Sequence, residues 1–461
     1  MKKELIIGAL KDKKIVILGF GKEGISSYHF IRKYFPNQPL TIADGNENLK
    51  VDEYQEDKNL SFVLGAEYDR HLNDYDLIMK TPGVNLTRLD YFIVPQKITS
   101  QTDLFCRAFG AQMIGVTGTK GKSTTASLIF HILNQTIGNT LLAGNIGVPF
   151  FDIIDKINDE TTIVAELSAH QLEFITASPH VAILLNMFQE HLDHFNSFSN
   201  YQLAKLNITE YQNEQDTLIY NADNQYIVEL LKSHQYQRRF FPFSRQTVLA
   251  DGAYSHDTEI IIASNRKIIH QYELAEFNHL PGAHNYYNIM AAILACETRE
   301  VDDGAILNAL KDFKGLEHRI EFVGKFRDIS FYNDSISTIP EATIAAVNSL
   351  RKVDTLIIGG FDRGIDYQPL IDFLYENPIR NVVFMGPAGK RILKEWKKQG
   401  RPMPESFMIE DNFDKIVAYA YQNTAKNKIC LLSPAASSYD RFKNFEERGR
   451  CFKEKVKNYE Y

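Results

Sequence analysis

Residues 113–124 of this chain read MIGVTGTKGKST, a stretch in which an apolar run meets a glycine-rich turn. The apolar residues 113–116 predict a buried β-strand, and the glycines at 118 and 121 predict a tight turn after it. A helix is expected next, because apolar side chains recur at helical spacing, at Ala126, Ile129, Phe130 and Leu133. A strand, a turn and a helix in this order indicate a parallel α/β domain.

The turn in this stretch has the composition of a phosphate-binding loop. Backbone N–H groups of a glycine turn can surround phosphate oxygens, Lys122 can reach the β- and γ-phosphates, and Ser123 can ligate Mg²⁺. Val116 stands where the full Walker A pattern has glycine, so the match to that pattern is inexact. We predict an ATP-binding loop made of Gly118, Thr119, Lys120, Gly121, Lys122, Ser123 and Thr124.

Short apolar runs of this kind recur along the chain, at residues 15–18, 114–116, 163–167, 181–185, 356–358, 382–385 and 429–432. Segments with helical periodicity lie between many of them, which predicts the α/β class with parallel sheets covered by helices. Three separate sheet patterns start at about residues 15, 113 and 331. We therefore expect three domains, at residues 1–98, 99–301 and 302–461.

The bulk composition is that of an ordinary soluble protein, with 461 residues, 44% hydrophobic and 24% charged. A net charge of -7 without a long basic run argues against nucleic acid as a partner. The sequence shows no apolar stretch long enough for a signal peptide or a membrane span, so a cytoplasmic location is expected. The four cysteines are scattered and lack metal-ligand spacing, so we expect them to be reduced.

A second glycine loop, Gly19-Phe20-Gly21-Lys22-Glu23-Gly24, follows the predicted strand 15–18, and Asp44 closes the next strand. Taken alone, this pattern is a weak dinucleotide fingerprint, in which glycines admit a pyrophosphate and an acid reaches a ribose hydroxyl. A dehydrogenase is therefore one alternative, and a tight turn without any ligand is another. A phosphate-containing ligand is the interpretation that we favour.

Polar groups follow two further predicted strands. Glu166 comes directly after residues 162–165, and His191, Asp193 and His194 follow the run 181–185. The carboxyl ends of parallel strands meet at one edge of a sheet, so Glu166 is expected beside the nucleotide as a Mg²⁺ ligand. The two histidines and Asp193 raise the alternative of a zinc site. We favour Mg²⁺, because a fourth zinc ligand is lacking and phosphate oxygens suit the harder ion.

The motifs in their order resemble the Mur ligase family. Its central domain is matched by residues 118–123, Gly144-Asn145-Ile146-Gly147, Glu166-Leu167-Ser168, His191-Leu192-Asp193, His284-Asn285 and Asn288. Folylpolyglutamate synthases share much of that core. The outer segments, residues 315–319, Asn333-Asp334-Ser335, 434–440 and 443–449, are similar to the branch of the family that adds D-glutamate.

The resemblance implies a Rossmann-like N-terminal domain, a central P-loop-type ATPase domain with a parallel sheet, and a Rossmann-like C-terminal domain. It implies ATP-dependent ligation of D-glutamate to the alanyl carboxylate of UDP-N-acetylmuramoyl-L-alanine through an acyl phosphate, in peptidoglycan precursor synthesis. ATP and one or two Mg²⁺ ions are the cofactors that it implies, and we expect a monomer. The phosphate loop also weakens the dehydrogenase alternative, because a dehydrogenase has no use for it.

The resemblance assigns roles residue by residue. The implied catalytic residues are Lys122, Glu166, His191 and Lys205, and the implied metal ligands are Ser123, Glu166, His191 and a carbamylated Lys205. The implied nucleotide contacts outside the loop are Asn285, Asn288, Arg319 and Asp334. The UDP-substrate is expected at Gly21, Lys22, Glu23, Asp44, Thr81, Asn145 and Ser168, and glutamate at Thr338, Arg363, Ser438 and Phe445.

Two positions depart from the family pattern. Ile336 stands where the family usually has a lysine, and an apolar side chain cannot donate a hydrogen bond to a substrate carboxylate. The added amino acid therefore has two candidates, D-glutamate and L-glutamate, with a folylpolyglutamate synthase-like ligase as a further alternative. Ala169-His170 replaces the Ser-Phe pair that is common in the family, and the sequence offers no interpretation of this change.

Overall fold

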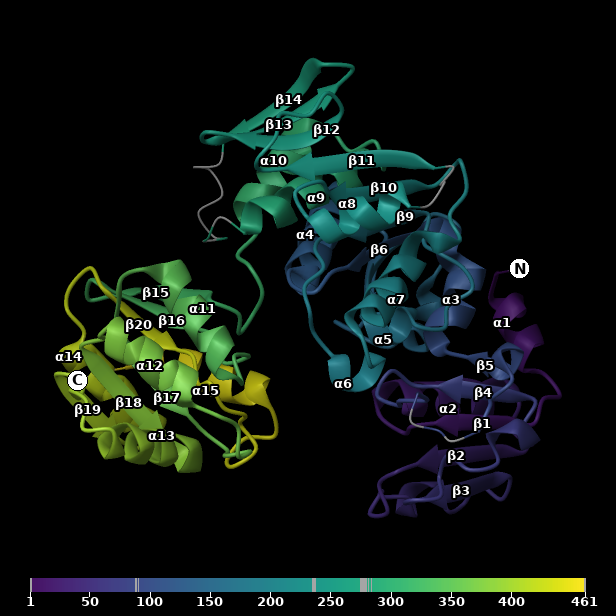
Figure 1. Cartoon of the computed structure of the whole chain (residues 1–461), viewed down its shortest axis with the longest axis horizontal. Helices are drawn as coiled ribbons and strands as arrows, with labels where there is room; N and C mark the ends of the chain where they lie inside the picture. The colour runs from purple at the N-terminus through teal and green to yellow at the C-terminus, as the bar shows by residue number, and fades with distance from the viewer. Residues whose placement is uncertain are drawn as a thin grey trace. The chain divides into compact units, whose positions relative to one another are not determined.

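The computed structural model describes residues 2–87, 89, 91–233, 238–273, 280, 282 and 284–459. Three β-sheets organise these residues, and most of their strand pairs are parallel (Figure 1). The described residues form two compact units, one of residues 2–273 with 284–311 and the other mainly of residues 312–459. The α/β class with parallel sheets is confirmed, whereas the boundaries near residues 98 and 301 stay predictions.

The first sheet has five parallel strands in the order β3-β2-β1-β4-β5. Its strands are β1 (Ile15–Leu18), β2 (Leu40–Asp44), β3 (Leu60–Leu64), β4 (Leu77–Lys80) and β5 (Ile98–Thr99). Helices α1 (Lys2–Leu10), α2 (Lys22–Tyr34) and α3 (Gln101–Phe109) accompany it. Strand order reverses at β1, so the glycine loop after β1 opens at the switch point where such sheets bind ligands.

The second sheet has nine strands in the order β14-β13-β12-β11-β10-β9-β6-β8-β7. Strands β6 to β12 pair with one another in parallel. They are β6 (Met113–Thr117), β7 (Thr140–Gly144), β8 (Thr162–Glu166), β9 (Val181–Leu184), β10 (Thr217–Asn221), β11 (Arg239–Ser244) and β12 (Gly252–His256). Antiparallel β13 (Glu259–Ser264) and β14 (Lys267–Glu273) extend one edge. Because β6 lies between β8 and β9, the loop after β6 again opens at a switch point.

Seven helices cover this sheet in the described chain: α4 (Lys122–Thr136), α5 (Ala169–Leu172), α6 (Leu192–Phe195), α7 (Phe198–Glu210), α8 (Gln225–Lys232), α9 (Asn285–Glu297) and α10 (Asp303–Asp312). Figure 1 shows α9 and α10 beside the β12–β14 edge. Strands β6, β8 and β9 are buried along their whole length. Coverage on both faces explains why they are continuous apolar runs in the sequence.

The second unit is built on a six-stranded sheet in the order β15-β16-β20-β17-β18-β19. Its strands are β15 (Glu321–Phe326), β16 (Ile329–Asn333), β17 (Val353–Gly359), β18 (Asn381–Met385), β19 (Ser406–Ile409) and β20 (Ile429–Leu432), and its helices are α11 (Pro340–Leu350), α12 (Gln368–Glu376), α13 (Gly386–Lys398), α14 (Phe413–Asn423) and α15 (Phe445–Lys457). The sheet starts at residue 321, ten residues before the predicted start. Antiparallel β15 is an edge strand without a buried apolar run, which is why the pattern missed it.

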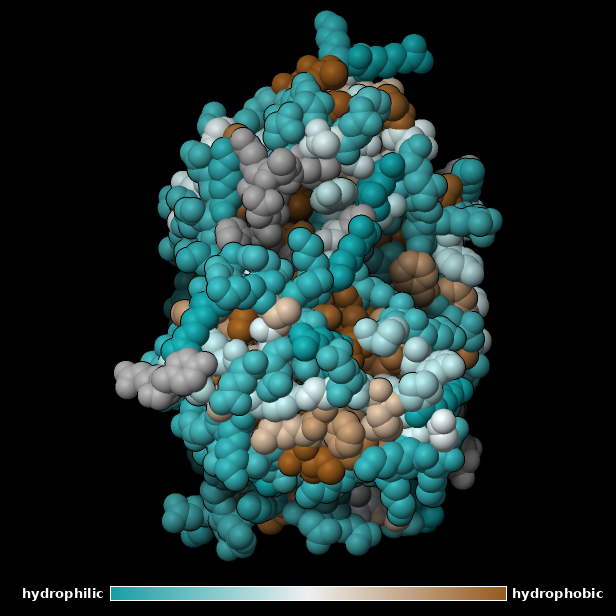
Figure 2. All heavy atoms as spheres, turned by 90° about the vertical axis from the view of Figure 1, so that its left-hand side faces the viewer, coloured by the Kyte–Doolittle hydropathy of each residue, from teal (hydrophilic) through white to brown (hydrophobic). Residues whose placement is uncertain are grey.

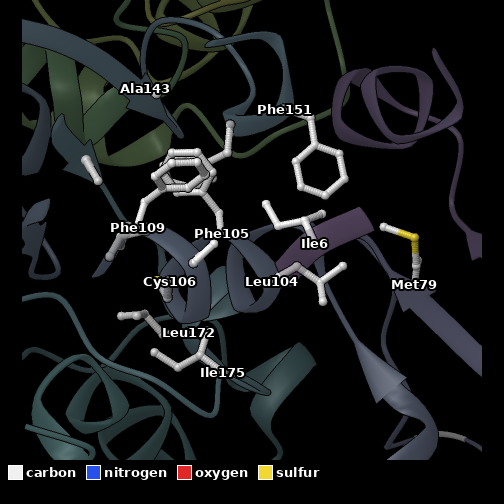
Figure 3. Packing of buried hydrophobic residues seen from close by; sticks show 14 of the residues in the cluster. Ile6, Met79, Leu104, Phe105, Cys106, Phe109, Ala143, Phe151, Leu172 and Ile175 are labelled. Carbon is white, nitrogen blue, oxygen red and sulfur yellow. The ribbon is translucent and has the colours of Figure 1, made fainter. Parts of the chain in front are cut away.

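One apolar core joins the first two sheets. Helix α3 supplies Phe105, which is fully buried and stacks on Phe150 with ring centroids 4.6 Å apart. Figure 3 shows Ile6, Met79 and Leu172 around the same helix, from segments far apart in the sequence. Full burial of such side chains contributes roughly 1.5–3 kcal/mol each. The shared core accounts for the two sheets forming a single compact unit.

The surface in Figure 2, the helix lengths and the cysteines can each be described directly. On the face in Figure 2, hydrophilic side chains predominate and apolar residues emerge in small groups. Among the described helices, none is both long enough and apolar enough to cross a membrane. The four cysteines, Cys106, Cys296, Cys430 and Cys451, are unbonded, and the first three are buried.

Candidate active site

The phosphate loop joins β6 to α4 and depends on glycine at residue 121. Gly121 has φ +89°, a conformation that L side chains rarely adopt, and a Cβ there would lie 2.5 Å from Asn288 Oδ1. Asn288 is buried on the first turn of α9, where its Oδ1 accepts a hydrogen bond from Thr125 Oγ1 (3.2 Å) and its Nδ2 donates to Asn285 Oδ1 (2.8 Å). Asn288 thus lies against the loop, and Asn285 holds its side chain from the same turn of α9.

Backbone groups of the loop are held by residues that follow β9. Asn186 Oδ1 accepts from Lys120 N (2.8 Å), and Asn186 Nδ2 donates to Lys120 O (3.0 Å). Thr119 Oγ1 accepts from Phe188 N (2.9 Å) and lies 3.0 Å from the Tyr201 hydroxyl. These bonds fix the loop before any phosphate arrives. Sequence reasoning gave Asn186 no role.

The first turn of α4 starts immediately after Gly121 and has no side-chain cap. Lys122, Ser123 and Thr124 occupy this turn, where helical N–H groups lack intrahelical partners and the helix dipole favours an anion. Lys120 is exposed and forms an ion pair with Glu190 (2.7 Å). The predicted loop residues therefore come together around a site that suits a phosphate.

Two lysines share one carbonyl oxygen in this loop. Lys122 Nζ and Lys205 Nζ each donate to Gly118 O, both at 2.8 Å. Lys205 lies on α7 but is only 1% exposed, and its ammonium faces the Tyr201 ring at 4.8 Å. Burial, and then the Lys122 charge, hold the pKa of Lys205 well below its usual range. Lys205 is therefore a buried lysine whose charged form is disfavoured, and not an exposed helical lysine.

Glu166 ends β8 and is 1% exposed. Its Oε1 accepts a hydrogen bond from Asn145 Nδ2 (2.7 Å), whereas its Oε2 is buried and has no hydrogen-bond partner in the described chain. An unpartnered buried carboxylate oxygen is costly unless a cation takes it. Mg²⁺ prefers such oxygen ligands, so the residues present fit the ion that the sequence implied.

His191 lies at the start of the short helix α6 with φ +57°, and its side chain is half-exposed. The His170 ring lies between two others, 4.9 Å from His191 and 4.3 Å from His194, and His194 Nε2 binds Glu173 (3.1 Å). Burial and the neighbouring histidines lower the pKa of His170 to about 3, and burial lowers that of His191. Ligand atoms of His191, Asp193 and His194 do not converge in the described structure, which disfavours the zinc alternative.

A cavity of about 460 Å³ lies between the first glycine loop and the loop after β7. It is lined by the predicted substrate residues Gly21, Lys22, Glu23, Asp44, Thr81 and Asn145, with Phe20, Tyr68 and Pro82 among the others. Ser168 is absent from this lining and instead caps α5, accepting from Gln171 N (3.3 Å). The structure thus brings together all but one of the residues predicted for the UDP-substrate.

Within the cavity, Asp44 supports the glycine loop. Its Oδ2 accepts from Phe20 N (2.7 Å) and its Oδ1 from Asn46 N (2.8 Å). Gly19 has φ +91°, and a Cβ there would meet Thr81 Oγ1 at 2.1 Å. The loop geometry therefore needs both the carboxylate and the glycine, which adds a structural role to the ligand role predicted for Asp44.

Glu23 lines the same cavity as a largely buried acid. Its Oε1 accepts from Gln171 Nε2 (2.6 Å), and its Oε2 has no hydrogen-bond partner among the described residues. Burial raises the pKa of Glu23 to about 7, against the opposing effects of Gln171 and Lys80. Lys80 is itself buried and pairs with Glu173 (3.1 Å). Sequence reasoning missed both Gln171 and Lys80, because neither belongs to a recognisable motif.

The remaining predicted residues lie in the second unit. Asp334 is buried and accepts from Ile320 N (3.1 Å) and Ser433 Oγ (2.7 Å), and burial raises its pKa to about 6. Arg363 is exposed and donates from Nη2 to Thr338 O (3.0 Å), so these two residues are neighbours. Three more predicted positions differ in exposure, with Arg319 exposed, Phe445 half-buried and Ser438 buried.

Arg448 is the residue of this unit that sequence reasoning left without a role. It is 1% exposed and donates to Ser335 Oγ (2.9 Å), Ser335 O (2.8 Å) and the carbonyls of Ala436 and Ser437 (both 3.1 Å). Ser335 Oγ in turn donates to Phe445 O (2.8 Å). Arg448 therefore ties together the loops after β16 and β20. The sequence signal that could have identified Arg448 is its position in the segment 443–449, which resembles the D-glutamate-adding branch.

Comparison with known proteins gives concordant results. The sequence model of the Mur ligase middle domain matches residues 116–296. A UDP-N-acetylmuramoylalanine–D-glutamate ligase of Pediococcus pentosaceus is 35% identical over 456 residues, spanning 97% of this chain and 98% of the relative. The ligase of the same name from Acetivibrio thermocellus is 32% identical over 466 residues, spanning 98% of this chain and 97% of the relative.

Solved structures share the fold at lower identity. The UDP-N-acetylmuramate-alanine ligase MurC of Thermotoga maritima aligns with a TM-score of 0.55 and 18% identity, over 96% of this chain and 99% of that one. A MurF structure from Acinetobacter baumannii aligns with a TM-score of 0.58 and 17% identity, over 79% and 84%. The arrangement of three sheets is therefore one that these ligases also have.

Proposed function

The chain belongs to the Mur ligase family, and we propose that it joins D-glutamate to the alanyl carboxylate of UDP-N-acetylmuramoyl-L-alanine at the expense of ATP. The near full-length similarity to ligases of that name supports the reaction. The observation that carries the proposal is a phosphate loop and a separate substrate cavity in one compact unit. Such a ligase acts in peptidoglycan precursor synthesis, and we place it in the cytoplasm as a monomer.

The chemistry requires activation of a carboxylate. The γ-phosphoryl group of ATP passes to a carboxylate oxygen of the alanyl residue, which gives an acyl phosphate and ADP. The glutamate amine then attacks the acyl carbon, the bond from this carbon to the phosphate oxygen breaks, and phosphate and a proton leave. Without phosphorylation, the negative charge of the carboxylate opposes attack. Catalysis of phosphoryl transfer rests mainly on positioning and charge neutralisation.

We propose that residues of this chain supply both the positioning and the charge neutralisation. In the proposed reaction, the N–H groups of the loop and the first turn of α4 hold the phosphates, and Lys122 turns from Gly118 O toward the γ-phosphoryl group. Asn288 and Asn285 support the loop from α9. Ser123, Glu166, His191 and a carbamylated Lys205 would hold Mg²⁺, which would offset phosphoryl charge.

We propose that Lys205 carries a carbamate. A neutral amine is the form that attacks CO₂, and the low pKa and deep burial of Lys205 favour that form. The product places an anion beside the Lys122 ammonium, at a position where burial and the Lys122 charge disfavour the protonated form of Lys205. The resulting carboxylate-like group suits Mg²⁺, directly or through an ordered water.

The UDP part of the substrate is proposed to occupy the 460 Å³ cavity. The α2 N-terminus, which starts at Lys22 and lacks a side-chain cap, suits the diphosphate. Asn145 lies at the opposite wall and contacts Glu166, so it links the substrate side to the metal side. Titration with NAD tests the competing dinucleotide interpretation, which predicts binding of NAD and none of a UDP-sugar.

For glutamate we propose Arg363, Thr338, Ser438 and Phe445. Arg363 offers a planar fork that suits a carboxylate, and its contact with Thr338 O brings it to the loop that contains Ile336. Ile336 is half-buried and cannot replace the usual lysine as a donor. Ile336 therefore keeps L-glutamate as the second candidate, since the proposed ATP and metal sites would serve the addition of either glutamate.

The decisive experiment measures phosphate release by the full chain with ATP, Mg²⁺ and UDP-N-acetylmuramoyl-L-alanine, with D- or L-glutamate added. We expect release that depends on both substrates and prefers D-glutamate. Preference for L-glutamate supports the second candidate, and turnover with a folate substrate supports a folylpolyglutamate synthase-like ligase. The Lys122→Ala variant is the inactive control, and Lys394→Ala, at a helical lysine of the second unit, controls for loss of charge alone. No turnover with either glutamate contradicts the proposal.

For the metal, Glu166→Gln keeps the side-chain shape but removes the charge that the proposed Mg²⁺ needs. We expect the Mg²⁺ concentration for half-maximal rate to rise by about tenfold to a hundredfold. Glu160→Gln, an exposed position just before β8, is the matched control. An unchanged Mg²⁺ dependence in Glu166→Gln contradicts the assignment.

A further inference from the structure

Three potential metal ligands meet at the antiparallel edge of the nine-stranded sheet, away from the residues assigned above. They are His270 on β14, Glu297 at the end of α9 and Asp303 at the start of α10. One ligand atom of each lies within 4.8 Å of the others. Three separate elements thus bring one imidazole and two carboxylates to a single point, which in the described chain is the one convergence of this kind.

The contacts inside this cluster leave ligand capacity unused. His270 Nδ1 contacts Asp303 Oδ2, and the Tyr272 hydroxyl donates to Asp303 Oδ1 (3.1 Å). Glu297 Oε1 is buried and has no hydrogen-bond partner among the described residues. Tyr272 orients the Asp303 carboxylate in the way that an outer hydrogen bond orients a metal ligand. The imidazole and Asp303 side chains are each about one third exposed, which leaves room for a water ligand.

Nearby charges do not neutralise Glu297. It is the last residue of α9, where the negative end of the helix dipole disfavours a carboxylate. Arg299 is two residues away, but its Nε and Nη2 are themselves buried without a hydrogen-bond partner in the described structure, and burial and Asp303 are the influences on the Glu297 carboxyl. A cation between Glu297 and Asp303 would satisfy the orphan oxygen and offset both carboxylate charges.

We propose that His270, Glu297 and Asp303 bind a divalent transition-metal ion, Zn²⁺ or Mn²⁺. A nitrogen ligand with two carboxylates matches ions that accept both donor types, and a water completes the coordination of three protein ligands. The ion takes the place of the proton between His270 and Asp303. Mg²⁺ and Ca²⁺ fit less well, because they favour all-oxygen ligand sets.

The site is structural in character. Strand β14 is the edge of the sheet and pairs with β13 alone, with His270 opposite Ile262. The ion would tie this edge to the end of α9 and the start of α10. Glu297 follows Asn288, the α9 residue that faces the phosphate loop, by nine residues, so about 14 Å of helix separates the two. The ion therefore stabilises the edge of the sheet and takes no part in phosphoryl transfer.

The test uses the metal-free full chain without nucleotide, titrated by calorimetry with Zn²⁺, Mn²⁺ and Mg²⁺ in turn. We expect the wild-type chain to bind one more equivalent of Zn²⁺ or Mn²⁺ than His270→Ala or Asp303→Asn. Saturation with that ion should raise the Tm of the wild-type chain by roughly 5 °C more than the Tm of these variants. Tyr272→Phe keeps all three ligands and should weaken the affinity about 10- to 100-fold.

His256→Ala is the matched control, because it removes another histidine of the same sheet, one that is exposed and lies 3.5 Å from the adjacent Asp257. Circular dichroism checks that each variant is folded, and Glu297→Gln provides a milder change if His270→Ala does not fold. Equal stoichiometry and affinity in the wild-type chain and all ligand variants overturns the proposal. Loss of the extra equivalent in His256→Ala also overturns it. Ligase activity is not part of the readout, so the outcome is independent of the proposed function.

Discussion

Replacement of Gly121 by alanine tests whether the phosphate loop binds ATP in the shape that the structure shows. The new methyl group would lie 2.5 Å from Asn288 Oδ1, well inside contact distance, at a residue with φ +89°. A left-handed conformation costs an alanine about 1–2 kcal/mol. Displacement of Asn288 also breaks its bond with Thr125 Oγ1, which is worth about 1 kcal/mol.

The variant can relieve both costs by letting the loop leave its native shape. A nucleotide must then restore the loop, so the cost appears as lost affinity. A total of about 2–3 kcal/mol corresponds to a roughly 30- to 150-fold higher Kd for ATP, since 1.4 kcal/mol is tenfold. Isothermal titration with ATP and Mg²⁺ measures the change directly.

Gly138→Ala is the matched control. Gly138 also has positive φ, +64°, just beyond the end of α4, but a Cβ there would meet nothing within 4 Å. It should therefore lose about 1–2 kcal/mol of stability and keep the wild-type affinity for ATP. An ATP affinity of Gly121→Ala within twofold of wild type, or an equal loss in Gly138→Ala, refutes the reasoning.

Three more predictions concern buried or altered groups. Lys205→Ala should lower kcat about 10- to 100-fold, with partial rescue by acetate if a carbamate is the missing group. The control Lys232→Ala, which replaces an exposed helical lysine, should leave kcat unchanged. Full activity of Lys205→Ala contradicts the assignment. Folding raises the pKa of Glu23 from 4.5 to about 7, so between pH 4.5 and about pH 7 this residue binds more protons in the folded than in the unfolded chain. The folded chain therefore loses stability as the pH rises through that window. Glu23→Gln should thus gain about 3 kcal/mol relative to wild type in urea unfolding at pH 8 and nothing at pH 4. A pH-independent difference would show that burial of the charge is not the cause. Ile336→Lys should lower the KM for glutamate roughly tenfold, because it adds a charged hydrogen-bond donor. The control Ile339→Lys, at an exposed position, should leave this KM unchanged. Equal KM values in the two variants argue against a substrate carboxylate near residue 336.

The candidate site was partly predictable because some of its parts are local. The loop at 118–121 and Glu166 at the end of β8 depend on residues close in sequence, so composition and spacing were enough to find them. Asn186 and Arg448 were not assigned, although both are central to the geometry. Each acts through backbone groups far away in the chain, as when Asn186 binds Lys120, and no local pattern encodes that pairing.

By itself, the sequence determined the α/β class, the two glycine loops and the strands that carry them, because a buried parallel strand and a glycine turn are written in consecutive residues. Only the tertiary structure decided the states of the charged groups. The pKa of Lys205 is lowered and that of Glu23 is raised because residues from other strands and helices remove water from them. The convergence of His270, Glu297 and Asp303 is likewise a property of three packed elements. Burial and through-space distance depend on the whole fold, and spacing along the chain does not report them.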